Sequence, residues 1–159
     1  MSARPVPVRP ARPDDAGPLT ALVFASKASV GYDDAFMQAC RAELAVTPER
    51  LRVGRWWVAQ DASGRLGCCQ LLADASRPEA GRIEVFFVHP SSQRGGVGRA
   101  LWSVLSDAAR ADGLTGLELD ADPAAVGFYR RLGFVGNGSV PSGSIAGRRL
   151  PRMVLSLVA

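Results

Sequence analysis

The sequence predicts a mixed α/β fold, and three features support this prediction. Residues 55–60 and 65–74 are apolar runs on either side of a glycine-containing turn, and residues 81–90 form a third run. Apolar residues then recur at helical spacing from Val97 to Ala108. The element order is strand, two helices, three strands, helix, strand, helix, two strands, which is typical of a sheet with helices on its faces.

The elements before the three strands are predicted from caps and spacing. Residues 5–10 alternate like a short edge strand, where proline is tolerated. Asp14 or Asp15 is expected to cap a first helix, and residues 33–44 repeat the helix signal. The chain should therefore have two helices before its main sheet.

The elements after residue 97 are bounded by glycine and proline. The helix from Gly96 should end near Gly113, and residues 114–121 should form a strand. Asp122 and Pro123 are expected at the start of a helix that ends at Gly133. Two strands follow at 134–140 and 150–158, and the Gly- and Ser-rich residues 136–149 should form a mobile loop.

Composition indicates one domain, 1–159, in which 47% hydrophobic residues can form a core. The net charge is +4, but the arginines are scattered from Arg4 to Arg152. A basic stripe interleaved with aromatics is missing, so nucleic-acid binding is not expected. Cys68 and Cys69 should point to opposite faces of one strand as small core residues. We expect a cytoplasmic protein without a membrane span or signal peptide.

The glycine turn "QRGGVGRAL" is the clearest candidate for a binding site. Glycines at a helix start let backbone N–H groups approach an anion closely. A Walker A loop is excluded because the Lys-Ser/Thr pair is missing. A dinucleotide fingerprint is excluded because Leu101 stands at its third glycine position. The remaining pattern is Q-x-x-G-x-G, from Gln93 to Gly98.

This pattern resembles the coenzyme A turn of the GCN5-related N-acetyltransferase (GNAT) family, written [RQ]-x-x-G-x-[GA]. Residues 122–134, "DPAAVGFYRRLGF", are similar to the second family signature, with Asp122 in place of the common Asn. Residues 26–32 also resemble an S-K-A-x-x-G-Y segment of bacterial members, with Val30 where Trp often stands. The resemblance implies a mostly antiparallel sheet of about seven strands, acetyl-CoA as co-substrate and no metal.

The coenzyme site is expected along the third strand run and the glycine turn. Backbone N–H groups of Arg94 to Ala100 would bind the pyrophosphate, and glycines would remove Cβ atoms from its path. The resemblance further implies that pantetheine binds backbone groups of a strand that splays from its neighbour. The predicted residues are Phe86, Phe87, Val88, Gln93, Arg94, Gly95, Gly96, Val97, Gly98, Arg99, Ala100, Asp122 and Phe128.

Two residues are predicted to be catalytic. Tyr129 matches the family tyrosine that donates a proton to the leaving thiolate, although packing alone would also explain it. Glu84 interrupts an apolar strand, so we expect partial desolvation to raise its pKa towards that of a general base. A structural ion pair is the alternative for Glu84, and Asp120, Asp33 and Asp34 are rival bases. His89 is expected to be a cap or surface residue.

The acceptor side is the least defined part of the prediction. It should involve the two N-terminal helices and the loop 136–149, with Lys27, Tyr32, Asp33 and Asp120 as substrate-binding candidates and Trp56 and "GSIAGRR" as further ones. Lys27, the sole lysine, would bind an acceptor carboxylate or form a structural salt bridge.

The resemblance implies transfer of acetyl from acetyl-CoA to a primary amine of a small molecule or peptide. A different acyl group, or a non-catalytic acyl-CoA-binding regulator, is the alternative. A homodimer is expected through the C-terminal strand, taken as an exposed sheet edge.

Overall fold

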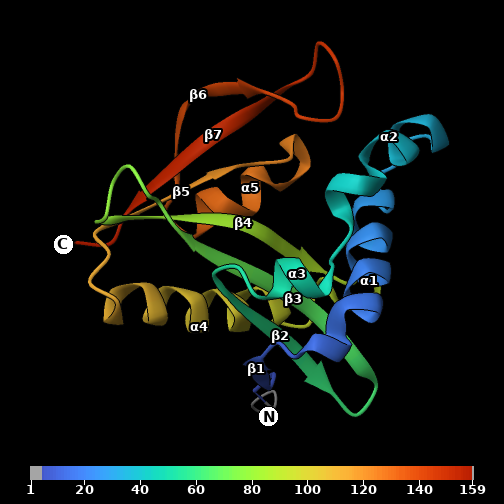
Figure 1. Ribbon diagram of the computed structural model, residues 1–159, viewed down its shortest axis with the longest axis horizontal. Helices are drawn as coiled ribbons and strands as arrows, with labels where there is room; N and C mark the ends of the chain where they lie inside the picture. Colours follow the sequence, from blue (N-terminus) through green and yellow to red (C-terminus); the bar gives the residue numbers. More distant parts are fainter. Residues whose placement is uncertain (1–4, 159) are drawn as a thin grey trace.

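Seven strands form one sheet in the computed structural model, which describes residues 5–158 (Figure 1). Their order is β1-β2-β3-β4-β5-β7-β6, and every neighbouring pair is antiparallel except β4 and β5. This confirms the predicted mixed sheet. The strands are β1 (Val8–Pro10), β2 (Arg55–Asp61), β3 (Gly64–Ala73), β4 (Ala80–Val88), β5 (Gly116–Asp120), β6 (Val135–Pro141) and β7 (Arg149–Ser156).

The helices agree with the predicted ones, with one addition. A single-turn helix, α3, follows α2 because Thr47 accepts a hydrogen bond from the Arg50 N–H and Pro48 occupies the first helical position. The sequence prediction of only two helices before the sheet is therefore wrong. The helices are α1 (Ala16–Ala28), α2 (Asp34–Leu44), α3 (Pro48–Leu51), α4 (Val97–Ala111) and α5 (Val126–Arg131), with 3₁₀ turns at Pro13–Asp15, Pro90–Ser92 and Pro123–Ala125.

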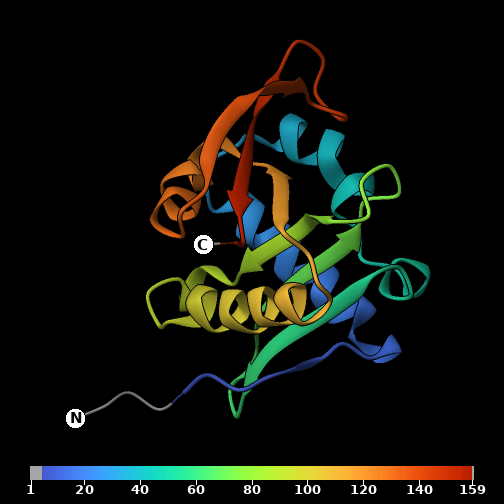
Figure 2. The same cartoon turned by 90° about the vertical axis from the view of Figure 1, so that its left-hand side faces the viewer.

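The helices cover both faces of the sheet. On one face α4 packs across β1–β4, as Figure 2 shows, and Cys69 lies in its core with Leu101 and Leu105. On the other face α1 and α2 bury Cys68 with Leu19. The two adjacent cysteines therefore point to opposite faces as predicted, and all three thiols are free. Within residues 5–158 no helix has both the length and the apolar character to span a membrane.

The sheet opens between β4 and β5. These strands pair only from Ala80–Arg82 to Gly116–Glu118, and then diverge towards the right of Figure 1. A β-bulge lies at the same place, because Val85 faces Gln70 and Ile83 faces Leu71 while Glu84 has no partner on β3. The bulge also reverses the alternation of side chains along β4, so that Val85 faces α1 and α2 whereas Ile83 faces α4.

Two predictions about the C-terminal strands are wrong. The last strand, β7, is not an edge strand, because it pairs with β5 on one side and β6 on the other. Residues 136–141 belong to β6, which forms the edge of the sheet, and only residues 142–148 connect β6 to β7. Periodic sequence patterns identify a strand but not its neighbours, and β6 carries little apolar signal because most of its residues are exposed.

Asp15 has a different role from the predicted helix cap. It precedes α1, but its carboxylate makes no cap hydrogen bond there. Instead it is fully buried and accepts hydrogen bonds from Arg9, Arg65 and the backbone N–H of Arg12, at 2.6–2.9 Å. This carboxylate therefore links β1, β3 and the start of α1.

Candidate active site

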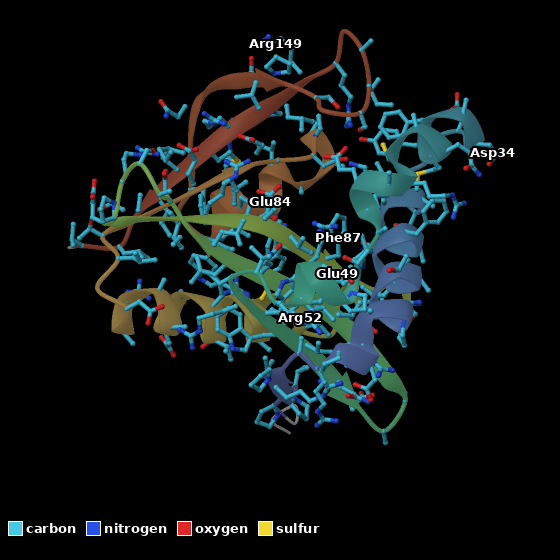
Figure 3. All side chains as sticks on the ribbon, in the orientation of Figure 1. Asp34, Glu49, Arg52, Glu84, Phe87 and Arg149 are labelled. Atoms are coloured by element: carbon cyan, nitrogen blue, oxygen red, sulfur yellow. The ribbon has the colours of Figure 1, made fainter. Side chains whose placement is uncertain are left out.

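A cavity of about 600 Å³ occupies the opening between β4 and β5. Its wall combines β4, the starts of α4 and α5, the end of β5, and residues from α1 to α3. Figure 3 shows Glu84 and Phe87 on β4 near the middle of the molecule, whereas Asp34 and Arg149 lie at its periphery. The predicted site residues on the cavity wall are Lys27, Glu84, Phe86, Phe87, Val88, Gln93, Gly98, Asp120, Asp122, Phe128 and Tyr129.

The glycine turn presents unpaired donors at the start of α4. Gly96 precedes the helix with a φ of +80°, a left-handed conformation that glycine adopts at little cost. Within residues 5–158, no acceptor lies within hydrogen-bond range of the backbone N–H groups of Gly96, Val97, Gly98 and Arg99. The helix dipole adds a partial positive charge, so this end of the cavity favours an anion. Among the predicted turn residues, Gln93 and Gly98 line the cavity wall. The others lie outside it: Arg94, Gly95, Gly96, Val97, Arg99 and Ala100.

Gly98 has a different structural role from the predicted one. A Cβ on this residue would lie 3.1 Å from the ring of Phe128, whereas a Cβ on Gly96 would meet nothing within 4 Å. Gly98 therefore allows Phe128 of α5 to approach the first turn of α4. The prediction that its missing Cβ makes room only for phosphate is incomplete, because the ring already occupies that side.

The β4 edge that faces β5 is free beyond Arg82. Antiparallel pairing with β3 continues to Val88 on the opposite edge, so this open edge is confined to the cavity side. Phe86, Phe87 and Val88 lie along it. Unpaired peptide groups in such an edge can bind an extended amide-containing ligand, as an additional strand would.

Tyr129 of α5 lies on the cavity wall. Its side chain packs edge-on against Phe86, Phe128 and Phe134, with ring centroids 5.3–6.2 Å apart, and the residue is 7% exposed. The hydroxyl has no hydrogen-bond partner within residues 5–158, but it is not completely buried. Gln70 Oε1 is the one side-chain polar atom in this range that is both completely buried and without a partner. Burial raises the pKa of the phenol well above its usual value. Tyr129 therefore keeps its proton at neutral pH.

A model of the acetyltransferase (GNAT) domain matches residues 52–136, which is more than half of the chain. The chain belongs to the GNAT family. No curated protein matches it. The matched segment runs from the α3–β2 connection through both signatures to β6, and it identifies the protein as a GNAT-type N-acetyltransferase.

Solved structures with the same fold extend over nearly the whole chain. A GCN5-related N-acetyltransferase, named as a class II aminotransferase, from Rhodopseudomonas palustris has a TM-score of 0.79 at 24% identity, covering 98% of each chain. PaiA N-acetyltransferase from Thermoplasma acidophilum, in complex with coenzyme A, has a TM-score of 0.77 at 16% identity over 98% and 99% of the two chains. N-acetylglutamate synthase from Neisseria gonorrhoeae, complexed with coenzyme A and N-acetyl-glutamate, has a TM-score of 0.70 at 20% identity. There the match covers 100% of this chain and 36% of the other. At these identities the likeness shows the fold.

Glu84, the predicted general base of this acetyltransferase, and its rival Asp120 are both ion-paired. Glu84 forms the ion pair that was the predicted alternative, because its carboxylate lies 2.9 Å from Arg82. Its side chain is 42% exposed, since at the bulge it belongs to neither core. Asp120 is paired with Arg82 and Arg152. Burial raises the pKa of Asp120, but the hydrogen bonds from both arginines outweigh it and leave the pKa below its usual value.

The acceptor-side candidates of the acetyltransferase have distinct positions. Lys27 forms a salt bridge with Asp122, 2.5 Å away, and Tyr32 donates a hydrogen bond to the same carboxylate. Asp122 also accepts a hydrogen bond from the Ala124 N–H, so the predicted helix cap is confirmed. Asp33 is instead the exposed cap of α2 and lies outside the cavity wall.

Three other observations complete the comparison with the sequence. His89 is a cap, as predicted, since its Nδ1 accepts a hydrogen bond from the Ser91 N–H. Trp56, a predicted acceptor-binding candidate, is a core residue outside the cavity wall, and its indole N–H donates to the carbonyl of Arg50. Arg50 and Glu43 line the cavity but were not predicted, because the signal of α3 was missed and no pattern placed α2 against β4.

Proposed function

We propose that this acetyltransferase moves acetyl from acetyl-CoA to a primary amine of a small molecule or peptide by direct attack. One observation carries the proposal. A single cavity joins the glycine turn at the start of α4, where Gln93 and Gly98 line its wall, with a free strand edge and a protonated, buried tyrosine. These are the three features that a thioester of a phosphorylated, amide-containing carrier requires.

The coenzyme would lie along β4 with its pyrophosphate at the start of α4. The unpaired N–H groups of residues 96–99 supply donors without a competing side-chain acceptor. Arg94 and Arg99 flank them and can add charge-assisted hydrogen bonds. The pantetheine amides would pair with the free edge at Phe86 to Val88. Two of the neighbouring structures hold coenzyme A, which supports this assignment.

The reaction must remove a proton from the attacking nitrogen and supply one to the leaving sulfur. The neutral amine attacks the thioester carbonyl carbon and a C–N bond forms. The nitrogen then gives its extra proton to solvent, and collapse of the tetrahedral intermediate breaks the C–S bond. Tyr129 donates its proton to the departing thiolate, and the resulting phenolate takes a proton from solvent. Because the phenol is buried among aromatic rings, it is held protonated until the thiolate develops.

Glu84 is the proposed base that removes a proton from the acceptor ammonium, which supplies the neutral amine that attacks. It lies on the cavity wall and is exposed, so it can act directly or through water. Asp120 is the weaker candidate, because two arginines lower its pKa and so reduce its proton affinity. Lys27 and Tyr32 would form the acceptor side, and Asp122, which the sequence placed with the coenzyme, would join them because it is bonded to both.

The decisive experiment follows thiol release from acetyl-CoA against a panel of amines, amino acids and aminoglycosides. Amine-dependent release of coenzyme A would support catalysis and identify the acceptor class. Coenzyme binding without release for any acceptor would favour a regulator, and faster release from a longer acyl-CoA would change the donor.

Coenzyme placement is tested separately by calorimetry on two isosteric variants. Gly96→Asp and Gly96→Asn share the strain of a side chain at positive φ, but only aspartate adds a negative charge beside the unpaired N–H groups. We expect Gly96→Asp to abolish coenzyme A binding and Gly96→Asn to retain most of it. Equal affinities for the two folded variants would contradict a pyrophosphate at this turn.

A further inference from the structure

Three chain segments meet at the carboxylate of Asp122. Lys27, from the last turn of α1, places its ammonium 2.5 Å from Asp122 Oδ2. Tyr32, between α1 and α2, donates a hydrogen bond to the same oxygen at 2.8 Å. Arg148, from the β6–β7 connection, donates to the Tyr32 hydroxyl at 2.6 Å and lies 3.4 Å from Asp122. We refer to these four residues as the Asp122 cluster.

The Asp122 cluster carries one more positive than negative charge. Burial raises the pKa of Asp122, but the hydrogen bond from Lys27 outweighs it, so the net shift is downward and the carboxylate is ionised. Within residues 5–158, no other carboxylate lies within ion-pair distance of Lys27 or Arg148. Their side chains are only 12% and 17% exposed. A mostly buried excess charge of this kind is costly unless an anion compensates for it.

Aromatic rings hold both cations in place without satisfying their hydrogen bonds. Lys27 Nζ lies 5.2 Å from the ring centroid of Tyr32, and the Arg148 guanidinium lies 4.8 Å from that of Phe36. The two rings stack at 3.9 Å. Arg148 Nε and Nη1 and two of the ammonium hydrogens of Lys27 have no acceptor in the described part of the chain. These donors are therefore available to a ligand.

The Asp122 cluster lies at the proposed acceptor side of the cavity. Lys27 and Asp122 are part of the cavity wall, next to apolar side chains of α1, α2 and β4, whereas Tyr32 and Arg148 lie directly behind them, in contact with Asp122. Glu43, which also lines the cavity, is exposed and pairs with neither cation. We propose that Lys27 and Arg148 bind a carboxylate of the acceptor, so that the acetyltransferase acts on amines that also carry a carboxylate. This inference rests on the proposed function and specifies its substrate class.

Matched product analogues test the inference without requiring turnover. Calorimetry would compare N-acetylphenylalanine with N-(2-phenylethyl)acetamide, and N-acetylglycine with N-methylacetamide, each with and without coenzyme A. Members of a pair differ in one carboxylate. We expect the carboxylate form of at least one pair to bind about tenfold more tightly, since hydrogen bonds to charged groups are strong.

Two neighbouring arginines provide the variants. Arg148→Gln should reduce the preference for the carboxylate form to about twofold or less. Arg149→Gln is the matched control, because within residues 5–158 the Arg149 side chain bonds only to Ser139, and it lies at the outer end of β7 (Figure 3). This control should keep the full preference.

Equal binding within both pairs, tighter binding of the uncharged forms, or no binding of any analogue would overturn the inference. So would an equal loss of preference in both arginine variants. A titration with coenzyme A alone reports on the proposed function, so its failure is distinguishable from failure of the carboxylate site. If Arg148→Gln does not fold, Lys27→Gln replaces it with the same expected loss, because it leaves Arg148 paired with Asp122 and removes the excess positive charge.

Discussion

Tyr129 combines a fixed ring with a hydroxyl that has no hydrogen-bond partner among residues 5–158. Three aromatic neighbours hold the ring, so the hydroxyl can be removed without disturbing the packing. We expect Tyr129→Phe to lower the turnover number by ~10²- to 10⁴-fold, the usual contribution of a general acid. Melting temperature and coenzyme affinity should remain at wild-type values. Single-turnover kinetics checks this, and an unchanged chemical step would assign proton donation to water.

Glu84 and Glu118 allow a base to be distinguished from an ion pair. Both carboxylates contact Arg82, at 2.9 and 3.3 Å, but only Glu84 lies on the cavity wall. We expect Glu84→Gln to reduce turnover by ~10²-fold or more while coenzyme A binds normally. Glu118→Gln should leave turnover within about twofold of wild type, because it removes charge from the same arginine without reaching the cavity. If both variants lose the same steady-state rate, the loss comes from the ion pairs with Arg82, and Glu84 is not the base.

Asp15 makes the free energy of unfolding depend on pH in the acidic range. Burial raises its pKa, but the hydrogen bonds from Arg9, Arg65 and the Arg12 N–H lower the pKa by more. The folded-state pKa therefore lies below the unfolded value of about 3.9. A lowered pKa contributes stability above pH ~4, and this contribution is lost as pH falls towards the folded-state pKa.

Removing the Asp15 charge should therefore have a large effect at neutral pH. We expect Asp15→Asn to lower the free energy of unfolding by about 3 kcal/mol at pH 7, since it leaves two arginines without their buried partner. Urea denaturation at several pH values measures this. The difference from wild type should shrink below pH 4, and a difference that does not change with pH would refute the linkage.

At the scale of elements, the sequence predicts those whose signals are local. The turn before α4, the cap at Asp122 and the β2–β3 hairpin depend on residues a few positions apart, and all three are confirmed. The bulge at Glu84 is not visible in sequence, because it depends on the register of β4 against β3. The exposure of Glu84 and the central position of β7 follow from the same long-range pairing. Similarly, the Asp122 cluster includes a hydrogen bond between residues 116 positions apart. The sequence could therefore single out Lys27, Tyr32, Asp122 and the segment "GSIAGRR" one by one, but could not place them together.

The contact between α4 and α5 gives a prediction of its own. Gly98→Ala would place a Cβ 3.1 Å from Phe128, so the ring must move at the cavity wall. Because alanine favours a helix over glycine by about 1 kcal/mol, this gain offsets part of the overpacking cost and the net change in unfolding free energy should be small. Coenzyme A affinity should fall about tenfold in calorimetry, since the displaced ring narrows its path.

Gly95→Ala is the matched control for that experiment. Its Cβ would meet only the Ser92 carbonyl at 3.6 Å, an ordinary contact, and Gly95 does not have a positive φ. We expect near-normal coenzyme affinity. If both variants bind equally well, the Phe128 contact has no part in coenzyme binding.

At the scale of the whole molecule, the sheet consists of two parts that pair only through the first residues of β4 and β5. Strands β1–β4 form one part and β5, β7 and β6 the other, joined by three residue pairs between β4 and β5 (Figure 2). Neither edge of β7 is free, so a homodimer, which stays a prediction, cannot use this strand as an edge. A sheet-extending dimer would use β6 or β1.

Coenzyme A should join these two parts and stabilise the folded protein as a whole. A ligand that binds only the folded state at a hundredfold excess over its dissociation constant contributes about 2.7 kcal/mol, or roughly 5–10 °C in melting temperature for a chain of this size. Hydrogen exchange should slow at residues 86–88, where pantetheine would pair with the free β4 edge, and at residues 96–99, whose N–H groups lack acceptors. Gly96→Asn should retain the thermal shift and Gly96→Asp should lose it. Protection confined to α1 and α2, with no change at β4, would place the coenzyme elsewhere and contradict the proposed division of the cavity into a coenzyme end and an acceptor end.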